Sequence, residues 1–323
     1  MKFIGNTLDD ILHDVFPTIM LSGTEVEASR GSVKELLGVT IELTKPRARL
    51  SRSETRGKPF SCLGELLWYL SASDELDFIT HYIPKYAEES EDDMTVHGAY
   101  GPRLFRQRGH DQIENVIRLL KKKPTTRRAV IQIFGAEDLS RDFKEIPCTT
   151  TCQFFVRDNA LHMIITMRSN DAYIGLPHDV FCFTMMQEMV ARRLDVSLGS
   201  YIHFASNLHL YSRNEASVKA FLDEGIQATW EMPKMPEGDP RRSVQKLLEF
   251  ERKLRETGEA EYNLLPNESY WSDLGRLLHM HSSQGNRPSL EIIEAGLHAS
   301  DYAMYARQLY EVSTQKSARK ALQ

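Results

Sequence analysis

One cysteine of this sequence stands at the start of an apolar run, where its thiol could do chemistry. Cys148 lies in "EIPCTTTCQFF", directly after a proline and before a predicted strand. A thiol acts as a nucleophile when a positive neighbour favours its thiolate form. Arg168, in "MRSND", is a candidate neighbour because a hairpin would place its strand beside that of Cys148. The pattern allows a nucleophile, and it also allows a buried structural cysteine.

Three further arginines could bind an anion. Arg127 and Arg128, in "TTRRAV", stand immediately before another apolar run, and Arg30 precedes Gly31, which permits close backbone approach. Arginine offers planar, bidentate donors to phosphate oxygens. Neighbouring residues of a strand point to opposite faces, so one site within a single chain would rarely use both Arg127 and Arg128. These arginines therefore indicate a phosphate clamp or, alternatively, a solvated strand entrance.

Two other patterns place polar groups on predicted elements. His209 and Tyr211, in "NLHLYS", are two positions apart on a strand and share one face. They suit a sugar hydroxyl, or they are half-buried polar residues satisfied by the backbone. Glu65 lies in "CLGELLWYL", which is apolar on nearly all sides and predicts a buried helix. A carboxylate there is costly unless it is paired or functional.

The composition excludes several classes of protein. The 323 residues are 41% hydrophobic and 26% charged, enough for one large or two modest domains. A net charge of −5 argues against nucleic-acid binding through bulk charge. No apolar run reaches the roughly 18 residues of a membrane span. Asp9, Asp10 and Asp14 stand where a signal peptide would be basic and then apolar, so we expect a cytoplasmic protein.

The four cysteines are too few and too scattered for a disulfide scaffold. Cys148 and Cys152 have a metal-like spacing, but no second Cys or His pair completes a tetrahedral set, so we expect no metal. Cys62 and Cys182 lie in apolar stretches and are predicted to be small core residues.

The elements that must position these residues are strands mixed with buried helices. Without regular βαβ alternation, they predict an α+β fold. The expected helices are one near the N-terminus and those at 62–70, 112–123 and 178–194. The expected strands lie at 39–45, 128–135, 152–158, 160–169 and 200–212, with a basic loop at 45–60 and a tight turn at 157–160.

A proline-rich, polar connector at 231–242 divides the chain. We expect a catalytic core over residues 1–230 and a helical C-terminal extension over 231–323, with helices at 244–254 and 290–311. The extension carries no chemical motif. It could pack on the core, as we expect, or cover a site or mediate assembly.

In their order along the chain, these motifs resemble the thymidylate synthase superfamily from about Arg30 to Arg213. The matching features are Arg30, Glu65, Tyr100 in "HGAYGPRL", Arg127–Arg128, "PC" at 147–148, "RSND…GLP" and "HLY". The resemblance implies a mixed β-sheet with buried helices in a homodimer packed through the sheets. It also implies a pyrimidine nucleoside monophosphate as substrate and 5,10-methylenetetrahydrofolate as co-substrate.

The resemblance further implies a role for each residue. Cys148 would add to C6 of the base, so that C5 attacks the methylene group of the folate. Arg30, Arg168 and Ser169 would bind the phosphate of the substrate, with Arg127 and Arg128 donated across the dimer interface. His209 and Tyr211 would bind its sugar, and Asn170 would also contact the substrate. Around the base and folate, Glu65 would organise water and protons, Tyr100 would assist proton removal and Asp171 would meet the pterin.

Asp179, in "GLPHDV", departs from the Asn of thymidylate synthases. An amide suits the O4/N3 edge of uracil. A protonated carboxyl can accept from the 4-amino group of cytosine and donate to N3, and an ionised one can pair with protonated cytosine. A mispaired base leaves buried polar groups unmatched, which is worth orders of magnitude in selectivity. Asp179 therefore predicts a cytidine nucleotide.

A second departure concerns the tryptophans that shield the reaction intermediate from water in the synthases. Their positions hold Tyr86 and Glu89, and "SARKALQ" (317–323) replaces the apolar tail that closes over folate. Weaker shielding favours capture by water and a hydroxymethyl product. The motifs look closest to deoxycytidylate and cytidylate 5-hydroxymethyltransferases.

The leading hypothesis is therefore 5-hydroxymethylation of dCMP or CMP, with ribose and deoxyribose both open. C5 methylation of dUMP or dCMP is the first alternative. A non-catalytic nucleotide- or RNA-binding relative is the second, and retention of Cys148 and Glu65 argues against it.

Overall fold

The computed structural model describes residues 1–54, 59–307, 309 and 310. Within them eight strands form one sheet, in the order β1-β3-β8-β6-β5-β4, with β2 beside β3 and β7 beside β8. Parallel pairs (β1 with β3, β6 with β8) and antiparallel pairs (β3 with β8, β5 with β6) occur together. The predicted α+β class with a mixed sheet is confirmed. The strands are β1 (Lys2–Gly5), β2 (Thr24–Ala28), β3 (Gly31–Leu43), β4 (Val130–Gln132), β5 (Thr149–Arg157), β6 (Ala160–Met167), β7 (Asn170–Asp171) and β8 (Ser197–Tyr211).

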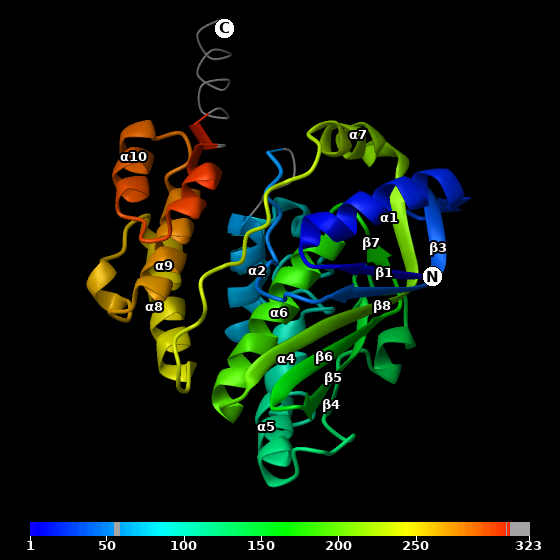
Figure 1. Ribbon diagram of the computed structural model, residues 1–323, viewed down its shortest axis with the longest axis horizontal. Helices are drawn as coiled ribbons and strands as arrows, with labels where there is room; N and C mark the ends of the chain where they lie inside the picture. The colour runs from blue at the N-terminus through cyan, green and yellow to red at the C-terminus, as the bar shows by residue number, and fades with distance from the viewer. Residues whose placement is uncertain (55–58, 308, 311–323) are drawn as a thin grey trace, which may run out of the picture.

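Helices build layers on one face of this sheet (Figure 1). α1 (Leu8–Ser22) packs on β1 and β3, and α6 (Gly175–Leu194) packs on β6 and β8. α2 (Pro59–Leu70), the predicted helix of Glu65, lies against α6, and α9 (Ser269–Ser282) packs against α2. The remaining helices are α3 (Leu76–Tyr82), α4 (Tyr100–Phe105), α5 (Gln112–Lys122), α7 (Glu215–Asp223), α8 (Arg241–Thr257) and α10 (Arg287–Ala295).

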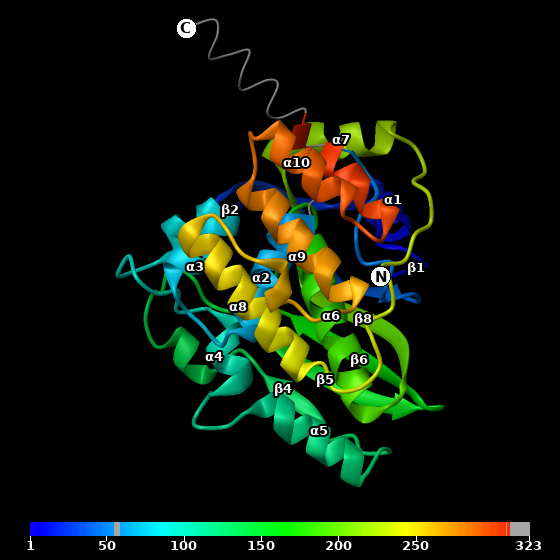
Figure 2. The ribbon, with the colours of Figure 1, turned by 90° about the vertical axis from the view of Figure 1, so that its left-hand side faces the viewer.

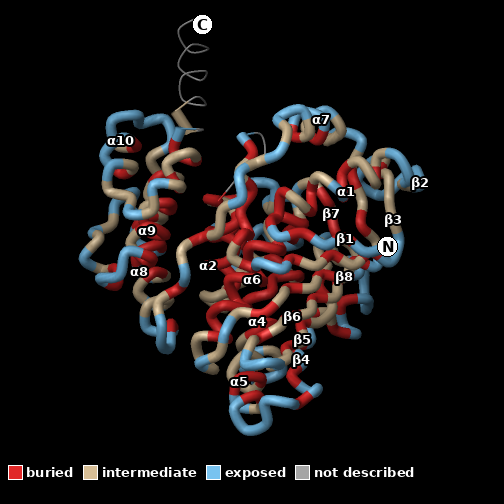
Figure 3. Tube along the Cα trace, in the orientation of Figure 1, coloured by how far each residue is buried: buried red, intermediate tan, exposed pale blue. Residues whose placement is uncertain are grey.

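The core lies between the sheet and its helices, where buried residues concentrate on α2 and α6 (Figure 3). Cys62 and Cys182 are buried there, as predicted. Side chains along β6 alternate strictly between buried and half-buried positions. Asp158 and Asn159 both have positive φ, at 49° and 55°. They form the tight turn predicted between β5 and β6, because positive φ at both central residues matches the twist of a hairpin.

The arginines that the structure describes in the basic loop predicted at 45–60 each lie close to a carboxylate. Arg49 forms a fully buried ion pair with Glu188 at 2.5 Å. Arg47 pairs with Glu231 at 2.8 Å, and Arg52 approaches Asp301 at 3.6 Å. These arginines therefore tie the segment to α6 and to residues beyond 230. Residues 55–58 of the loop lie outside the described residues.

The C-terminal helices stand as a further layer in front of α2 and α6 (Figure 2). The Tyr82 hydroxyl donates to Glu251 at 2.9 Å and links α3 to α8, and the Tyr270 hydroxyl of α9 reaches the Met185 sulfur of α6 at 3.5 Å. The domain boundary near residue 230 stays a prediction. No helix in the described part of the chain is long and apolar enough to cross a membrane.

The structure of this layer differs from the sequence-based expectation at two points. α9 was missed, although its buried residues Tyr270, Trp271, Leu274, Leu277 and Leu278 have helical spacing. The single helix expected at 290–311 is interrupted, because α10 ends at Ala295. The Asp273 carboxylate accepts the backbone N–H groups of His298 and Ala299, which a continuous helix would direct to its own carbonyls. Position 311 and the tail at 317–323 lie outside the described residues.

Candidate active site

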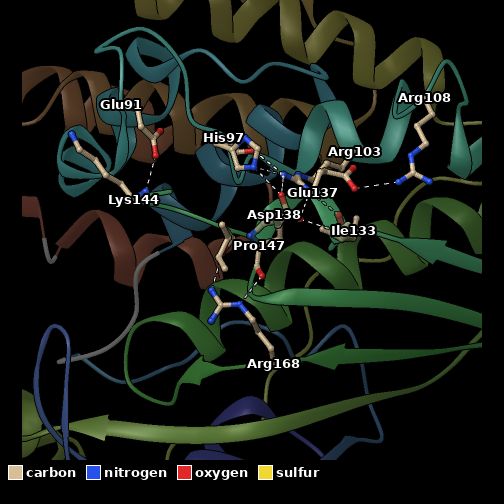
Figure 4. A network of polar contacts seen from close by, with 12 residues as sticks. Glu91, His97, Arg103, Arg108, Ile133, Glu137, Asp138, Lys144, Pro147 and Arg168 are labelled. Atoms are coloured by element: carbon tan, nitrogen blue, oxygen red, sulfur yellow. Dashed lines mark hydrogen bonds and ion pairs between the residues drawn. The ribbon is translucent and has the colours of Figure 1, made fainter. Parts of the chain in front are cut away.

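Cys148 stands one residue before β5, beside the end of β6. The Arg168 N–H donates to the Cys148 carbonyl at 2.8 Å, which confirms the predicted neighbourhood of the two residues. The Arg168 guanidinium turns back to the carbonyls of Pro147 at 2.9 Å and Ile146 at 3.0 Å (Figure 4). Burial raises the pKa of the Cys148 thiol to about 12, and the Arg168 charge offsets this only in part. In the free protein the thiol is protonated at neutral pH.

A buried ion pair holds the segment that leads to Cys148 (Figure 4). Arg103 of α4 donates to both carboxylate oxygens of Asp138, at 2.6 and 2.7 Å, and to the Ile133 carbonyl at 3.0 Å. This fixes α4 against the connection between β4 and β5. α4 begins at Tyr100, whose hydroxyl accepts the Thr149 N–H at 3.0 Å. Tyr100 is thereby placed beside the cysteine, and the sequence analysis had missed Arg103 and Asp138.

Glu65 is almost completely buried on α2, and hydrogen bonds to its carboxylate offset the free-energy cost of burying that charge. Its Oε1 accepts the hydroxyls of Tyr69 at 2.9 Å and Tyr86 at 3.3 Å. Its Oε2 lies 2.7 Å from Nδ1 of His178. The sequence analysis assigned no role to Tyr69 or His178. The only signal for His178 was its position next to Asp179 in "LPHDV".

Asp179 is buried on the first turns of α6. The Asn170 Nδ2 group donates to its Oδ2 at 2.8 Å. Burial and then the negative charge of Glu65 raise the pKa of Asp179 to about 8, so the carboxyl is mostly neutral at pH 7. The structure thus brings Glu65, Asp179 and Asn170 together, and we call these three residues the base end of the site.

Arg30 lies just before β3 and faces two carboxylates. Its guanidinium approaches Glu89 at 2.5 Å and Glu145 at 3.4 Å, and its side chain is 44% exposed. Burial and then the charge of Glu89 raise the pKa of Glu145 to about 7. The charges of both Arg30 and Arg168 act on Glu145 and on Cys148. These arginines, with the two carboxylates, form what we call the phosphate end.

Arg127 and Arg128 are exposed ahead of β4. No hydrogen bond or ion pair within the described residues joins either side chain to Arg30 or Arg168. Their predicted action across a dimer interface stays a prediction.

The predicted sugar contacts are neighbours on β8. The rings of His209 and Tyr211 meet edge to face with 5.1 Å between centroids, so the two residues share a face, as predicted. The Ser169 hydroxyl lies 3.5 Å from Nδ1 of His209. Burial lowers the pKa of His209, which keeps its ring neutral. Asp171 lies beside His209 in the sheet register, and its Oδ1 accepts the N–H groups of Tyr173 and Ile174.

The site thus places a buried thiol between arginines that could bind an anion and buried carboxylates that could move protons. The chain belongs to the thymidylate synthase family, whose family model matches residues 18–253. That range contains every candidate residue named above. Among the described residues, no three His, Cys, Asp or Glu side chains are grouped so that they could hold a metal ion.

Among its relatives are phage proteins named deoxyuridylate hydroxymethyltransferase. The protein of Pseudomonas phage M6 is 34% identical over 180 residues, which cover 54% of this chain and 50% of that protein. The protein of Delftia phage PhiW-14 is 28% identical over 71% of this chain and 67% of its own length. A thymidylate synthase of Francisella philomiragia is 28% identical over 48% of this chain and 62% of its own. The matches thus span between half and two thirds of these relatives.

Proposed function

We propose that the protein hydroxymethylates C5 of a cytidine monophosphate, dCMP or CMP, using 5,10-methylenetetrahydrofolate and water. Membership of the family supports one-carbon transfer to a pyrimidine nucleotide. The names of the phage relatives support a hydroxymethyl product. The observation that carries the choice of base is Asp179, a buried carboxyl that is mostly neutral at pH 7.

The hydrogen bond from Asn170 indicates how Asp179 would read cytosine. Because Nδ2 of Asn170 donates to Oδ2, that oxygen is an acceptor and the carboxyl proton belongs on Oδ1. Oδ1–H can then donate to N3 of cytosine, while the second lone pair of Oδ2 accepts the 4-amino group. Uracil presents a donor at N3 and an acceptor at O4, so both contacts would be mismatched. Mismatched buried edges cost orders of magnitude in rate.

The reaction needs a nucleophile and a route for protons. The Cys148 thiol loses its proton as its sulfur bonds to C6, and C5 bonds to the methylene carbon while the first of the two C–N bonds between that carbon and the folate breaks. The C5 proton then departs, with Tyr100 beside the cysteine to assist its removal, and the second C–N bond breaks, which releases tetrahydrofolate and leaves an exocyclic methylene group on C5. Water adds to the exocyclic methylene, and the bond between Cys148 and C6 breaks. The products are the 5-hydroxymethyl nucleotide and tetrahydrofolate, and no reductant is consumed.

The two positions that carry shielding tryptophans in the synthases are polar here. Tyr86 directs its hydroxyl to Glu65, and Glu89 pairs with Arg30. Polar groups at these positions favour a water molecule near the methylene group, where Glu65 can accept its proton. This supports capture by water over reduction to a methyl group.

The folate would meet Glu65 and Asp171. Asp171 uses Oδ1 for two backbone N–H groups, which leaves Oδ2 to accept an N–H group of a pterin ring. The folate supplies the one-carbon unit, while these carboxylates of the chain orient it.

We also propose that the enzyme is a homodimer packed through its sheets. The face of the sheet opposite α6 carries apolar side chains that are only half-buried: Phe155, Ile164, Ile202 and Phe204. A second copy covering this face would bury them, and Arg127 and Arg128 could then reach the phosphate end of the partner.

The test is incubation of the protein with CMP, dCMP, UMP or dUMP plus methylenetetrahydrofolate, with products identified by mass spectrometry. We expect a cytidine nucleotide that has gained one CH2O unit. Gain of one CH2 unit would show methylation. Hydroxymethylation of uridine nucleotides alone would assign the protein the activity named for its phage relatives. Nucleotide binding without any product would indicate a non-catalytic relative. Each of these three outcomes would overturn the proposal.

A further inference from the structure

His178 is a nearly buried residue that the proposed function leaves without a role. Its side chain is 11% exposed, and both of its ring nitrogens are engaged by α2. Nδ1 lies 2.7 Å from Oε2 of Glu65, and Nε2 lies 3.1 Å from the Ser61 hydroxyl. His178 precedes Asp179 on α6, so it connects the two carboxyl groups of the base end.

We propose that His178 is a positioning residue that fixes the Glu65 carboxylate beside Asp179 and thereby sets which pyrimidine base the site accepts. This inference rests on the proposed function, because it concerns the same base end.

The hydrogen bonds of Glu65 show why His178 differs from its other partners. Tyr69 and Tyr86 donate to Oε1, and His178 is the partner of Oε2 among the residues that the structure describes. Burial raises the pKa of both tyrosines well above the usual value, so neither carries a charge. Burial works against a charge on His178 too, but Cys62 and Glu65 outweigh it and raise its pKa to about 10. The ring is therefore an imidazolium at neutral pH, and it forms an ion pair with the Glu65 carboxylate.

The negative charge of Glu65 favours the protonated form of the Asp179 carboxyl. Two carboxyl groups that interact in a buried site share one proton, because both cannot ionise at low cost. The imidazolium lies against Glu65, so the proton goes to Asp179. The charge of His178 acts on Asp179 directly and lowers its pKa, but by less than the charge of Glu65 raises it, and Asp171 also raises it. Without His178, the Glu65 charge would no longer be fixed beside Asp179, so Asp179 would ionise more readily and lose its donor toward N3 of cytosine.

The test compares two substitutions of His178 in the full-length protein. His178→Phe keeps a planar ring and removes both hydrogen bonds. His178→Asn keeps a donor near the position of Nδ1 but cannot carry a charge. His279→Phe is the matched control, because this half-buried histidine of α9 pairs with Tyr262, away from the site. The measurement is kcat/KM for the preferred cytidine nucleotide and for its uridine counterpart between pH 6 and 9.

We expect His178→Phe to lower the ratio of cytosine to uracil kcat/KM by about tenfold or more, the scale of a lost buried hydrogen bond. The alkaline limb of its cytidylate profile should move to lower pH, since Asp179 then ionises more readily. His178→Asn should give an intermediate ratio, and His279→Phe a ratio like that of the wild type. Thermal unfolding and binding of the nucleotide establish that each variant is folded.

The outcomes separate this inference from the proposed function. If the wild type makes no hydroxymethylated cytidine nucleotide, the proposed function fails. If the wild type makes it and both His178 variants lower kcat for the two bases equally, with the ratio within twofold of the wild type, His178 is merely structural and the inference is overturned.

Discussion

The two ends of the candidate site differ in the exposure of their charged groups to solvent. At the base end, Glu65 and Asp179 are buried, and the partners described for them belong to this chain. At the phosphate end, Arg30 is 44% exposed in its side chain. Arg127 and Arg128, which we propose reach that end from the partner subunit, are exposed too. Preorganised buried groups discriminate strongly between bases, because any mismatch leaves them unpaired. Exposed arginines supply affinity for any nucleotide phosphate and discriminate little.

The phosphate end also holds its own competitors. Glu89 and Glu145 occupy the Arg30 guanidinium that the phosphate would use. Because such a partly exposed pair is worth about 1 kcal/mol or less, a phosphate can displace it. Changes at the base end should therefore alter which base reacts, whereas changes at the phosphate end should alter affinity for all nucleotides alike.

Cys148→Ala should have the largest effect, because the thiol stands between the two ends and forms the covalent bond. We expect turnover to be abolished while nucleotide affinity changes little, since the side chains proposed to bind the phosphate and the base are all retained. Product formation and calorimetric titration measure the two quantities. More than a few per cent of wild-type activity would remove Cys148 as the nucleophile.

Mixing two inactive proteins tests whether the phosphate end is shared between subunits. One carries Arg127→Ala and Arg128→Ala, and the other carries Cys148→Ala. If the arginines act across the interface, half of the mixed dimers are heterodimers with one complete site, so activity should recover to about a quarter of the wild-type value. No recovery, or a monomer in solution at the assay concentration, would contradict the shared site.

Asp179→Asn tests the base end by replacing a carboxyl with an amide of similar size. Activity on cytidine nucleotides should fall roughly 10²-fold or more, and turnover of uridine nucleotides should become measurable. The phosphate and sugar contacts belong to other residues, so binding through them should hardly change. A cytosine-to-uracil ratio within about threefold of the wild type, less than 1 kcal/mol, would show that Asp179 does not read the base.

The smallest effect is expected from the carboxylates of the phosphate end. Burial and Glu89 raise the pKa of Glu145 to about 7, so lowering the pH from 8 to 6.5 adds a proton and removes a negative charge beside Arg30. Nucleotide binding should therefore tighten by a few-fold on acidification, about 1 kcal/mol or less. Glu89→Gln should tighten binding at pH 8 in the same direction.

Glu145→Gln is the reference for the pH series, because its binding should lack this component. Glu137→Gln is the matched control, since Glu137 pairs with Arg108 at an exposed position. A wild-type pH dependence identical to that of Glu145→Gln would show that Glu145 does not compete for Arg30.

Local pattern alone was enough to predict the elements and the contacts made within a hairpin. The amphipathic run expected at 112–123 forms α5 at Gln112–Lys122, and the turn at 157–160 joins β5 to β6. Cys148 and Arg168 meet because a tight turn determines the register of the strands on either side of it. His209 and Tyr211 share a face because side chains alternate along a strand.

Contacts between elements far apart in the chain were decided by the tertiary structure. His178 contacts Glu65, which is 113 positions away in the sequence, and Arg30 contacts Glu89, which is 59 positions away. Periodicity places a side chain on one face of its own element, but it does not say which element packs against that face. The residue types of Glu65 and Asp179 were therefore evident in the sequence. The protonation of Asp179 was not evident, because the pKa of a buried carboxyl depends on the burial and the charged neighbours that packing creates.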